Sequence, residues 1–149
     1  MEAVLADIRE QGIELTYHLG DLVGYGPFPD AVVECIANGR ISGVAGNYDS
    51  TVALRYKHCG CAYEDPWQEE LSHLSVQWTV GAVSPETRRF LAALPFRLDE
   101  EGVLAVRFRR VTYDVERAAA AIESSALPRA FAEQLRSGDV RSGRPGSAS

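Results

Sequence analysis

The chain lacks any apolar stretch as long as a membrane-spanning helix, which needs about 20 residues. Its first segment, residues 1–10, carries acidic side chains where a secretory signal peptide would carry lysine or arginine. Cysteine is also scarce: Cys35, Cys59 and Cys61 form an odd set, which argues against a disulfide framework. We therefore expect a cytoplasmic protein that does not bind membranes and keeps its thiols reduced.

Positive charge is in deficit as well. The net charge of −6 gives the chain as a whole no electrostatic reason to bind DNA or RNA, so general nucleic-acid binding is not expected. A length of 149 residues with 46% hydrophobic residues is enough to build one core. We predict a single domain over residues 1–136 and a disordered tail over residues 137–149, which are rich in glycine, serine, arginine and proline.

The hydrophobic patterns in the first third of the chain predict an α/β fold. Residues 1–10 have the spacing of an amphipathic helix, and residues 13–19 form an apolar run typical of a buried strand. A helix opens at Pro29 and ends near Gly39, and a second buried strand covers residues 41–45. Strand, helix and strand in this order usually form a parallel, right-handed unit.

The remainder of the chain predicts more helices and one strand pair. A polar stretch over residues 50–65 is followed by helical spacing from Leu71 to Trp78, and Ser84 is a candidate N-cap for a helix over residues 85–94. Strands are expected over residues 96–98 and 103–111, joined by a turn. Asp114 is expected to cap a further helix, and another begins near Pro128.

Two short motifs follow the predicted strands of the first unit. Gly20-Asp21 ends the first strand and Gly46-Asn47 ends the second. Open α/β sheets bind ligands at the carboxyl ends of their strands, and oxygen-rich side chains there can hold a metal. Each motif alone is equally typical of an ordinary turn, because aspartate and asparagine bond their own backbone after a strand.

Together, in this order and on successive strands, the motifs resemble those of the calcineurin-like metallophosphoesterases. The likeness is to the small prokaryotic phosphodiesterases of that superfamily, and it extends from Met1 through Asp49 and residues 59–63 to Leu94-Pro95. Residues 113–116 and the closing helices also resemble the C-terminal end of that group. The resemblance implies a layered β-sandwich flanked by helices, here in a truncated or contracted form. It implies metal-dependent hydrolysis of a phosphodiester or phosphomonoester, with a phosphate-ester small molecule as the binding partner.

The resemblance also implies roles for individual residues. Asp21 would bridge two divalent cations (Mn, Fe, Ni or Zn), and Asn47 would ligate the second cation and, with Gly46, meet the substrate phosphate. Two such cations, about 3.5–4 Å apart, lower the pKa of a bound water that attacks the phosphorus. Tyr48 stands where many members of the superfamily carry a histidine that is a candidate acid for the leaving oxygen. Tyr48 is therefore the candidate catalytic residue.

Several motifs of the superfamily are missing from this sequence. No Asp-x-His precedes the first helix, and neither the later-strand histidine nor a Gly-His-x-His pair is present. His18, His58 and His73 do not stand in those contexts, so we do not predict them as ligands. A non-catalytic remnant that serves as a binding or oligomerisation module is therefore the alternative function.

Two smaller expectations follow. The spacing of Cys59 and Cys61 is tighter than the usual ligand gap of a structural zinc site, so no zinc is expected there. A sheet without its central strands exposes edges and apolar faces, which predicts a homo-oligomer.

Overall fold

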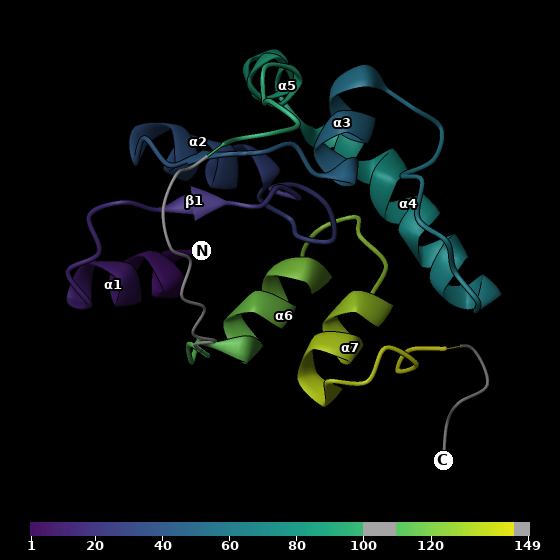
Figure 1. Ribbon diagram of the computed structural model, residues 1–149. Helices are drawn as coiled ribbons and strands as arrows, with labels where there is room; N and C mark the ends of the chain where they lie inside the picture. The colour runs from purple at the N-terminus through teal and green to yellow at the C-terminus, as the bar shows by residue number, and fades with distance from the viewer. Residues whose placement is uncertain (100–109, 145–149) are drawn as a thin grey trace.

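The computed structural model describes residues 1–99 and 110–144, and it is largely helical (Figure 1). The predicted turn at residues 100–102 and most of the predicted strand over residues 103–111 lie outside the described residues. The elements in chain order are α1 (Glu2–Glu10), β1 (Tyr17–His18), α2 (Pro29–Asn38), β2 (Ser42–Gly43), α3 (Asn47–Leu54), α4 (Pro66–Ala82), α5 (Pro85–Ala92), α6 (Val115–Glu123) and α7 (Ala130–Ser137).

The predicted strand–helix–strand unit is confirmed. β1 and β2 pair in parallel, with Tyr17 opposite Ser42 and His18 opposite Gly43, and α2 connects them. Each strand is only two residues long. Within residues 1–99 and 110–144 these two strands make the only sheet, so the layered β-sandwich is not found there.

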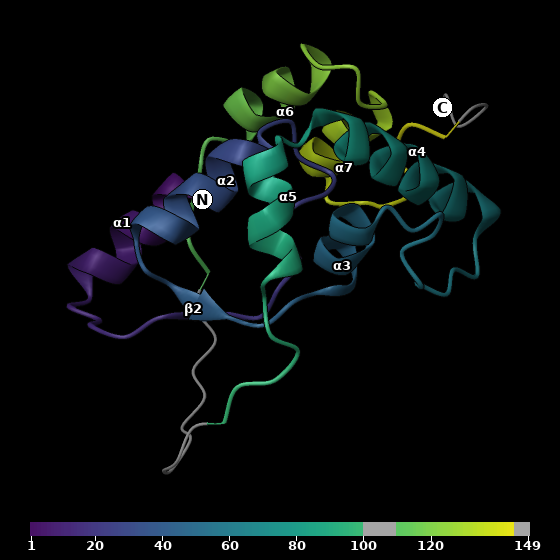
Figure 2. The ribbon, with the colours of Figure 1, turned by 90° about the horizontal axis from the view of Figure 1, so that it is seen from above.

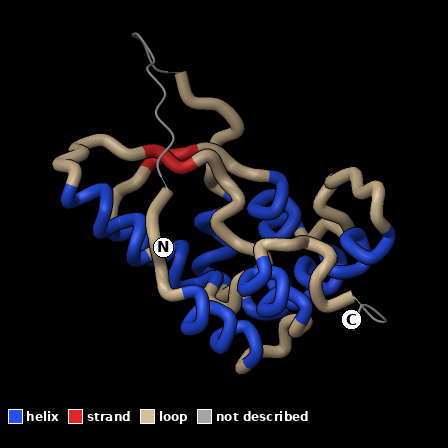
Figure 3. Tube along the Cα trace, turned by 90° about the horizontal axis from the view of Figure 1, so that it is seen from below, coloured by secondary structure: helices blue, strands red, loops and turns tan. Residues whose placement is uncertain are grey.

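The prediction that residues 13–19 form a buried strand is wrong. The exposed fractions of Ile13, Leu15 and Leu19 are 50%, 67% and 88%. Figure 3 shows the reason: the strand pair lies at the periphery of the molecule, and the helices gather on one side of it. Among the described elements β1 has only β2 as a neighbouring strand, so the apolar side chains of this segment point into solvent.

The expected strand over residues 96–98 is also wrong. The backbone N–H of Ala45 donates to the carbonyl oxygen of Pro95 at 2.7 Å, which brings this segment beside the end of β2. This single hydrogen bond does not make residues 96–98 a strand, and the side chain of Phe96 is exposed.

The predicted starts of α2, α5 and α6 are confirmed. α2 begins at Pro29, as predicted. The Ser84 hydroxyl accepts a hydrogen bond from the backbone N–H of Thr87 at 3.1 Å. The Asp114 carboxylate accepts from the backbone N–H of Arg117 at 2.8 Å. These side chains satisfy N–H groups that have no partner inside their helices, which fixes where α5 and α6 begin.

Helix α3 was not predicted. It begins at Asn47, directly after Gly46, and occupies residues that the sequence pattern assigns to a strand end and a polar stretch. The Asp49 carboxylate accepts from the backbone N–H of Gly46 at 2.9 Å, which is one half of a capping box. The second motif therefore lies at a helix N-terminus.

The described helices pack around three hydrophobic clusters. We call the two larger ones the N-terminal and the C-terminal cluster, and the third consists of Tyr48, Cys59 and Val76. Figures 1 and 2 show α6 and α7 side by side, with α2, α3 and α5 grouped on the other side of the molecule. Trp67 and Trp78 of α4 pack against the C-terminal cluster. The N-terminal cluster consists of Leu22, Val23, Val33, Ile36, Val52, Ala53, Val83 and Leu91. The C-terminal cluster consists of Leu71, Ala119, Ile122, Leu127, Ala130, Phe131 and Ala132.

The segment after α7 returns toward α4. The Gln134 side-chain amide donates to the carbonyl oxygen of Val140 at 2.8 Å, and Arg144 pairs with Asp65 at 3.5 Å. Of the predicted disordered tail, residues 145–149 lie outside the described residues. None of the helices in residues 1–99 and 110–144 has the length and apolar character needed to cross a membrane.

Candidate functional site

The two glycine motifs face each other. A Cβ atom added to Gly20 would lie 2.6 Å from the Cα of Gly46, and one added to Gly46 would lie 2.6 Å from the Cγ of Asp21. Real Cβ atoms do not approach other atoms this closely. Glycine at both positions therefore lets the loops after β1 and β2 touch, which brings Asp21 beside the start of α3, where Asn47 lies.

The Asp21 carboxylate lies at the N-terminus of α3. Its Oδ1 accepts a hydrogen bond from the backbone N–H of Tyr48 at 2.9 Å, and the side chain is exposed. The residue has a positive φ of 51°, in the left-handed region. A carboxylate in this place is stabilised by the helix dipole and by one of the free N–H groups of the first turn.

The Asn47 side chain is held by the segment that connects α3 to α4. Its Nδ2 donates to the carbonyl oxygen of Cys59 and to the Sγ of Cys61, both at 3.0 Å. Because the NH₂ group is engaged in this way, the carbonyl oxygen Oδ1 is the amide atom that can meet a cation.

Tyr48 lies in the interior rather than at the exposed edge where Asp21 stands. Its hydroxyl donates to the backbone carbonyl of Ser72 at 3.2 Å and lies 3.1 Å from the Ser72 hydroxyl. The ring packs against Gly24, where a Cβ atom would lie 2.6 Å from the Tyr48 Cε1. Burial raises the pKa of Tyr48 well above its ordinary value of 10.0. This geometry favours a packing role, and the catalytic role of Tyr48 stays a prediction.

Asp49 positions the site, and the sequence analysis did not single it out. Its carboxylate is fully buried and accepts from the backbone N–H groups of Leu22 at 2.8 Å and Gly46 at 2.9 Å. It thus ties the loop after β1 to the loop before α3. The sequence signal that could have identified Asp49 is its position three residues after Gly46, which is where the acidic residue of a capping box stands.

His18 lies at the base of the site, three residues before Asp21. Its Nδ1 accepts from the backbone N–H of Gly20 at 3.3 Å, and its buried Nε2 has no hydrogen-bond partner. Burial lowers the pKa of His18, and the nearby negative charge of Asp49 opposes this effect only in part. His18 is therefore a neutral side chain that supports the loop.

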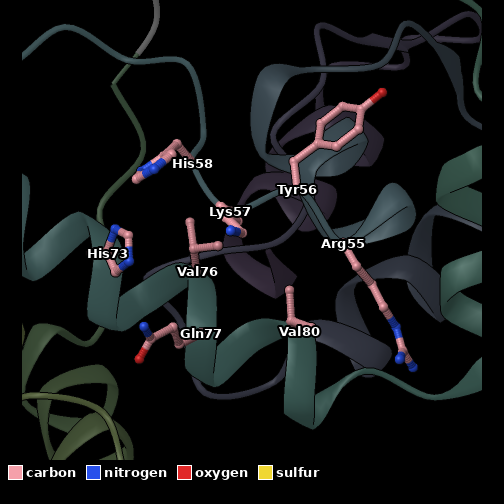
Figure 4. A pocket seen from close by; sticks show the side chains of 8 residues that line it. All are labelled: Arg55, Tyr56, Lys57, His58, His73, Val76, Gln77 and Val80. Atoms are coloured by element: carbon pink, nitrogen blue, oxygen red, sulfur yellow. The ribbon is translucent and has the colours of Figure 1, made fainter.

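The other two histidines lie elsewhere. The ring centroids of His58 and His73 are 5.0 Å apart, and both rings line a cavity of about 440 Å³ beside α4 (Figure 4). Figure 4 also shows the Arg55 side chain pointing away from this pair. Neither Asp21 nor Asn47 lines the cavity, so it is distinct from the site at the start of α3.

The described residues do not fit a two-metal centre. Within residues 1–99 and 110–144 no group of three or more histidine, cysteine or acidic side chains is placed to hold a metal ion. Asp21 and Asn47 offer two ligands, whereas Mn, Fe, Ni and Zn ions take about four to six. The structure thus brings together the two predicted ligands, without the others that a metal would need.

Comparison with known proteins gives partial likenesses. No family model matches the chain. An uncharacterized protein of Methanocaldococcus jannaschii is 33% identical over 100 residues, which is 67% of this chain and 38% of that protein. A solved metallophosphoesterase from Sphaerobacter thermophilus aligns with 85% of this chain and 51% of its own, at 25% identity and a TM-score of 0.49. The chain therefore spans between a third and about half of the length of these proteins.

Proposed function

We propose that this chain provides part of the active site of a metal-dependent phosphoesterase of the calcineurin-like type. The observation that carries the proposal is the contact between Gly20 and Gly46, which places Asp21 against the first turn of α3. A carboxylate and an amide oxygen thereby lie at the carboxyl ends of two parallel strands. That is where open α/β sheets bind their ligands.

Each residue of the site has a proposed role within this function. Asp21 supplies a carboxylate to a cation, Asn47 supplies its Oδ1, and the backbone of Gly46, which adjoins Asn47, is the proposed neighbour of the substrate phosphate. The substrate class is a phosphodiester or phosphomonoester small molecule. Since these residues alone do not hold two cations, the remaining ligands must come from residues of this chain outside the described ranges or from a second copy of the chain.

Hydrolysis of a model substrate tests the proposal. Purified protein with Mn²⁺ is incubated with bis(p-nitrophenyl) phosphate, and release of p-nitrophenol is compared with that of Asp21→Ala and Asn47→Ala. We expect Mn²⁺-dependent release that both substitutions reduce to the background rate. Circular dichroism of each variant confirms that it is folded. Equal rates for the three folded proteins would contradict the proposal.

A second candidate function is a non-catalytic binding or oligomerisation module. The observation that favours it is that the described residues contain no group of three or more side chains placed to hold a metal. This function predicts that Mn²⁺ neither changes the melting temperature nor promotes hydrolysis. A rise in the melting temperature that depends on Asp21 would argue against it.

A further inference from the structure

Two cysteines lie one residue apart in the segment between α3 and α4. The backbone N–H of Cys61 donates to the Cys59 Sγ at 3.4 Å. Gly60 between them has a φ of +75°, a left-handed conformation that turns the chain back on itself. The Cys59 sulfur therefore lies against the backbone of Cys61 within one tight turn.

The two thiols differ in their access to solvent. Cys59 is buried beneath α4, with its Sγ 3.5 Å from the Ser72 hydroxyl and 3.9 Å from the Tyr63 hydroxyl. Cys61 is exposed. An external reagent can therefore reach Cys61 directly, while Cys59 is placed to react with Cys61 from inside the turn.

The same turn holds the candidate ligand Asn47. Its Nδ2 contacts one cysteine through the carbonyl oxygen of Cys59 and the other through the Sγ of Cys61. Any reaction that moves the Cys61 sulfur changes the second of these two contacts. The state of the thiols and the orientation of the Asn47 amide are therefore linked.

We propose that Cys59 and Cys61 form a redox-active dithiol that closes to a disulfide when it meets a small-molecule disulfide. The Cys61 thiolate attacks one sulfur of that molecule, which forms a mixed disulfide and expels one thiolate. The Cys59 thiolate then attacks the Cys61 sulfur, which forms the Cys59–Cys61 bond and expels the second thiolate. Two electrons pass to the small molecule, and the two cysteine protons go to its two leaving thiolates.

Closure changes the candidate site. A disulfide holds its sulfurs about 2.05 Å apart, so closure bonds the Cys61 Sγ that now accepts from the Asn47 amide to the Cys59 Sγ. The contact between Asn47 and this sulfur therefore changes on closure. This part of the inference rests on the proposed function, because it makes the dithiol a control on a phosphoesterase ligand.

Thiol counting tests the dithiol independently of any hydrolysis. The reduced chain is treated with glutathione disulfide, denatured and labelled with a maleimide, and the added mass is measured. We expect three labels before oxidation and one after it, at Cys35, with peptide mapping that locates a Cys59–Cys61 bond. Cys35→Ser is the matched control and should still close. Cys59→Ser should stop at a mixed disulfide on Cys61.

Two outcomes would overturn the dithiol proposal. One is a wild-type chain that keeps three free thiols or stops at a mixed disulfide under the same conditions. The other is a disulfide between Cys35 and one of the two cysteines, in place of the Cys59–Cys61 bond.

Nuclear magnetic resonance of the Asn47 side-chain amide tests the link to the site. The resonance is assigned by its loss in Asn47→Asp, and we expect it to shift on oxidation of the wild type and not of Cys61→Ser. An unchanged resonance in a chain whose disulfide has formed would overturn the link alone. Failure of the phosphodiester assay with normal thiol closure would instead count against the proposed function.

Discussion

Two glycines set how closely the loops after β1 and β2 approach each other. Gly46 has a φ of −82° and a ψ of 176°, a conformation open to any residue, so what matters there is space and not backbone freedom. The neighbour that a side chain would meet is Asp21, which is itself fixed by the Tyr48 backbone. Gly46 can therefore be tested for packing alone.

The first prediction concerns Gly46→Ala. The added methyl group has no room beside Asp21, so we expect the free energy of unfolding to fall by about 1–3 kcal/mol, the usual cost of overpacking. Urea denaturation followed by circular dichroism measures it. Gly81→Ala in α4 is the matched control, because a Cβ there meets nothing within 4 Å. The control should be stabilised by up to about 1 kcal/mol through helix propensity.

The second prediction concerns the pH dependence caused by His18. Its pKa lies below the ordinary value of 6.5 in the folded protein, so below that pH the unfolded chain binds more protons than the folded one. The contribution of His18 to stability is complete above pH 6.5 and is lost as the pH falls toward the folded pKa. We expect His18→Asn to show a weaker loss of stability over this acidic range in urea denaturation. Parallel curves for the two proteins would contradict the assignment.

At the scale of elements, α3 joins the site to the N-terminal cluster. Its first turn receives Asp21, its Asp49 holds both loops, and its Val52 packs in the core with α2 and α5. The site is thus positioned by one short helix, whose buried acid holds the two loops together.

The third prediction concerns Asp49→Asn. The substitution turns one of the two acceptor oxygens into a donor that faces a backbone N–H, so one buried N–H loses its partner. We expect a loss of about 1.5–3 kcal/mol in the free energy of unfolding, the range for a hydrogen bond to a charged group. Asp114→Asn is the control, since asparagine caps a helix about as well as aspartate. Similar losses for both variants would show that burial of Asp49 does not matter.

The elements that could be predicted from the sequence are those that carry their own start signals. Pro29, Ser84 and Asp114 mark helix starts through local chemistry, and the parallel strand unit followed from the order of patterns. α3 was missed because Gly46 has no capping side chain, so its Gly-Asn pair is typical of a strand end as well. The approach of Asp21 and Asn47 was foreseen, but the buried carboxylate of Asp49 that secures it was not.

At the scale of the whole molecule, the strand pair stands outside the helical packing (Figure 3). Whether residues 13–19 are buried depends on which other elements pack against them. The hydrophobic pattern of a short segment carries no information about elements from elsewhere in the chain. Ile13, Leu15 and Leu19 lie at and beside β1 and are all exposed. Their spacing by even numbers of residues is the spacing that puts side chains on one face of a strand. An exposed apolar stripe on a strand edge favours association with another strand.

The fourth prediction is self-association through this segment. We propose that the chain forms homo-oligomers in which residues 13–19 of two copies meet. Sedimentation velocity over a range of concentrations should show a species larger than the monomer, and Leu15→Lys together with Leu19→Lys should return it to the monomer. Leu54→Lys, at an exposed position at the end of α3, is the control and should leave assembly unchanged. A wild-type monomer at every concentration would contradict this prediction.

The placement of the tryptophans has a spectroscopic consequence. The chain has two, Trp67 and Trp78, and both pack against the C-terminal cluster. Intrinsic fluorescence therefore reports on that half of the helical packing, while circular dichroism averages over every helix. Coincident transitions by the two signals would show that both clusters melt as one cooperative unit. An earlier fluorescence change would show that the C-terminal helices can open while the site at α3 stays folded.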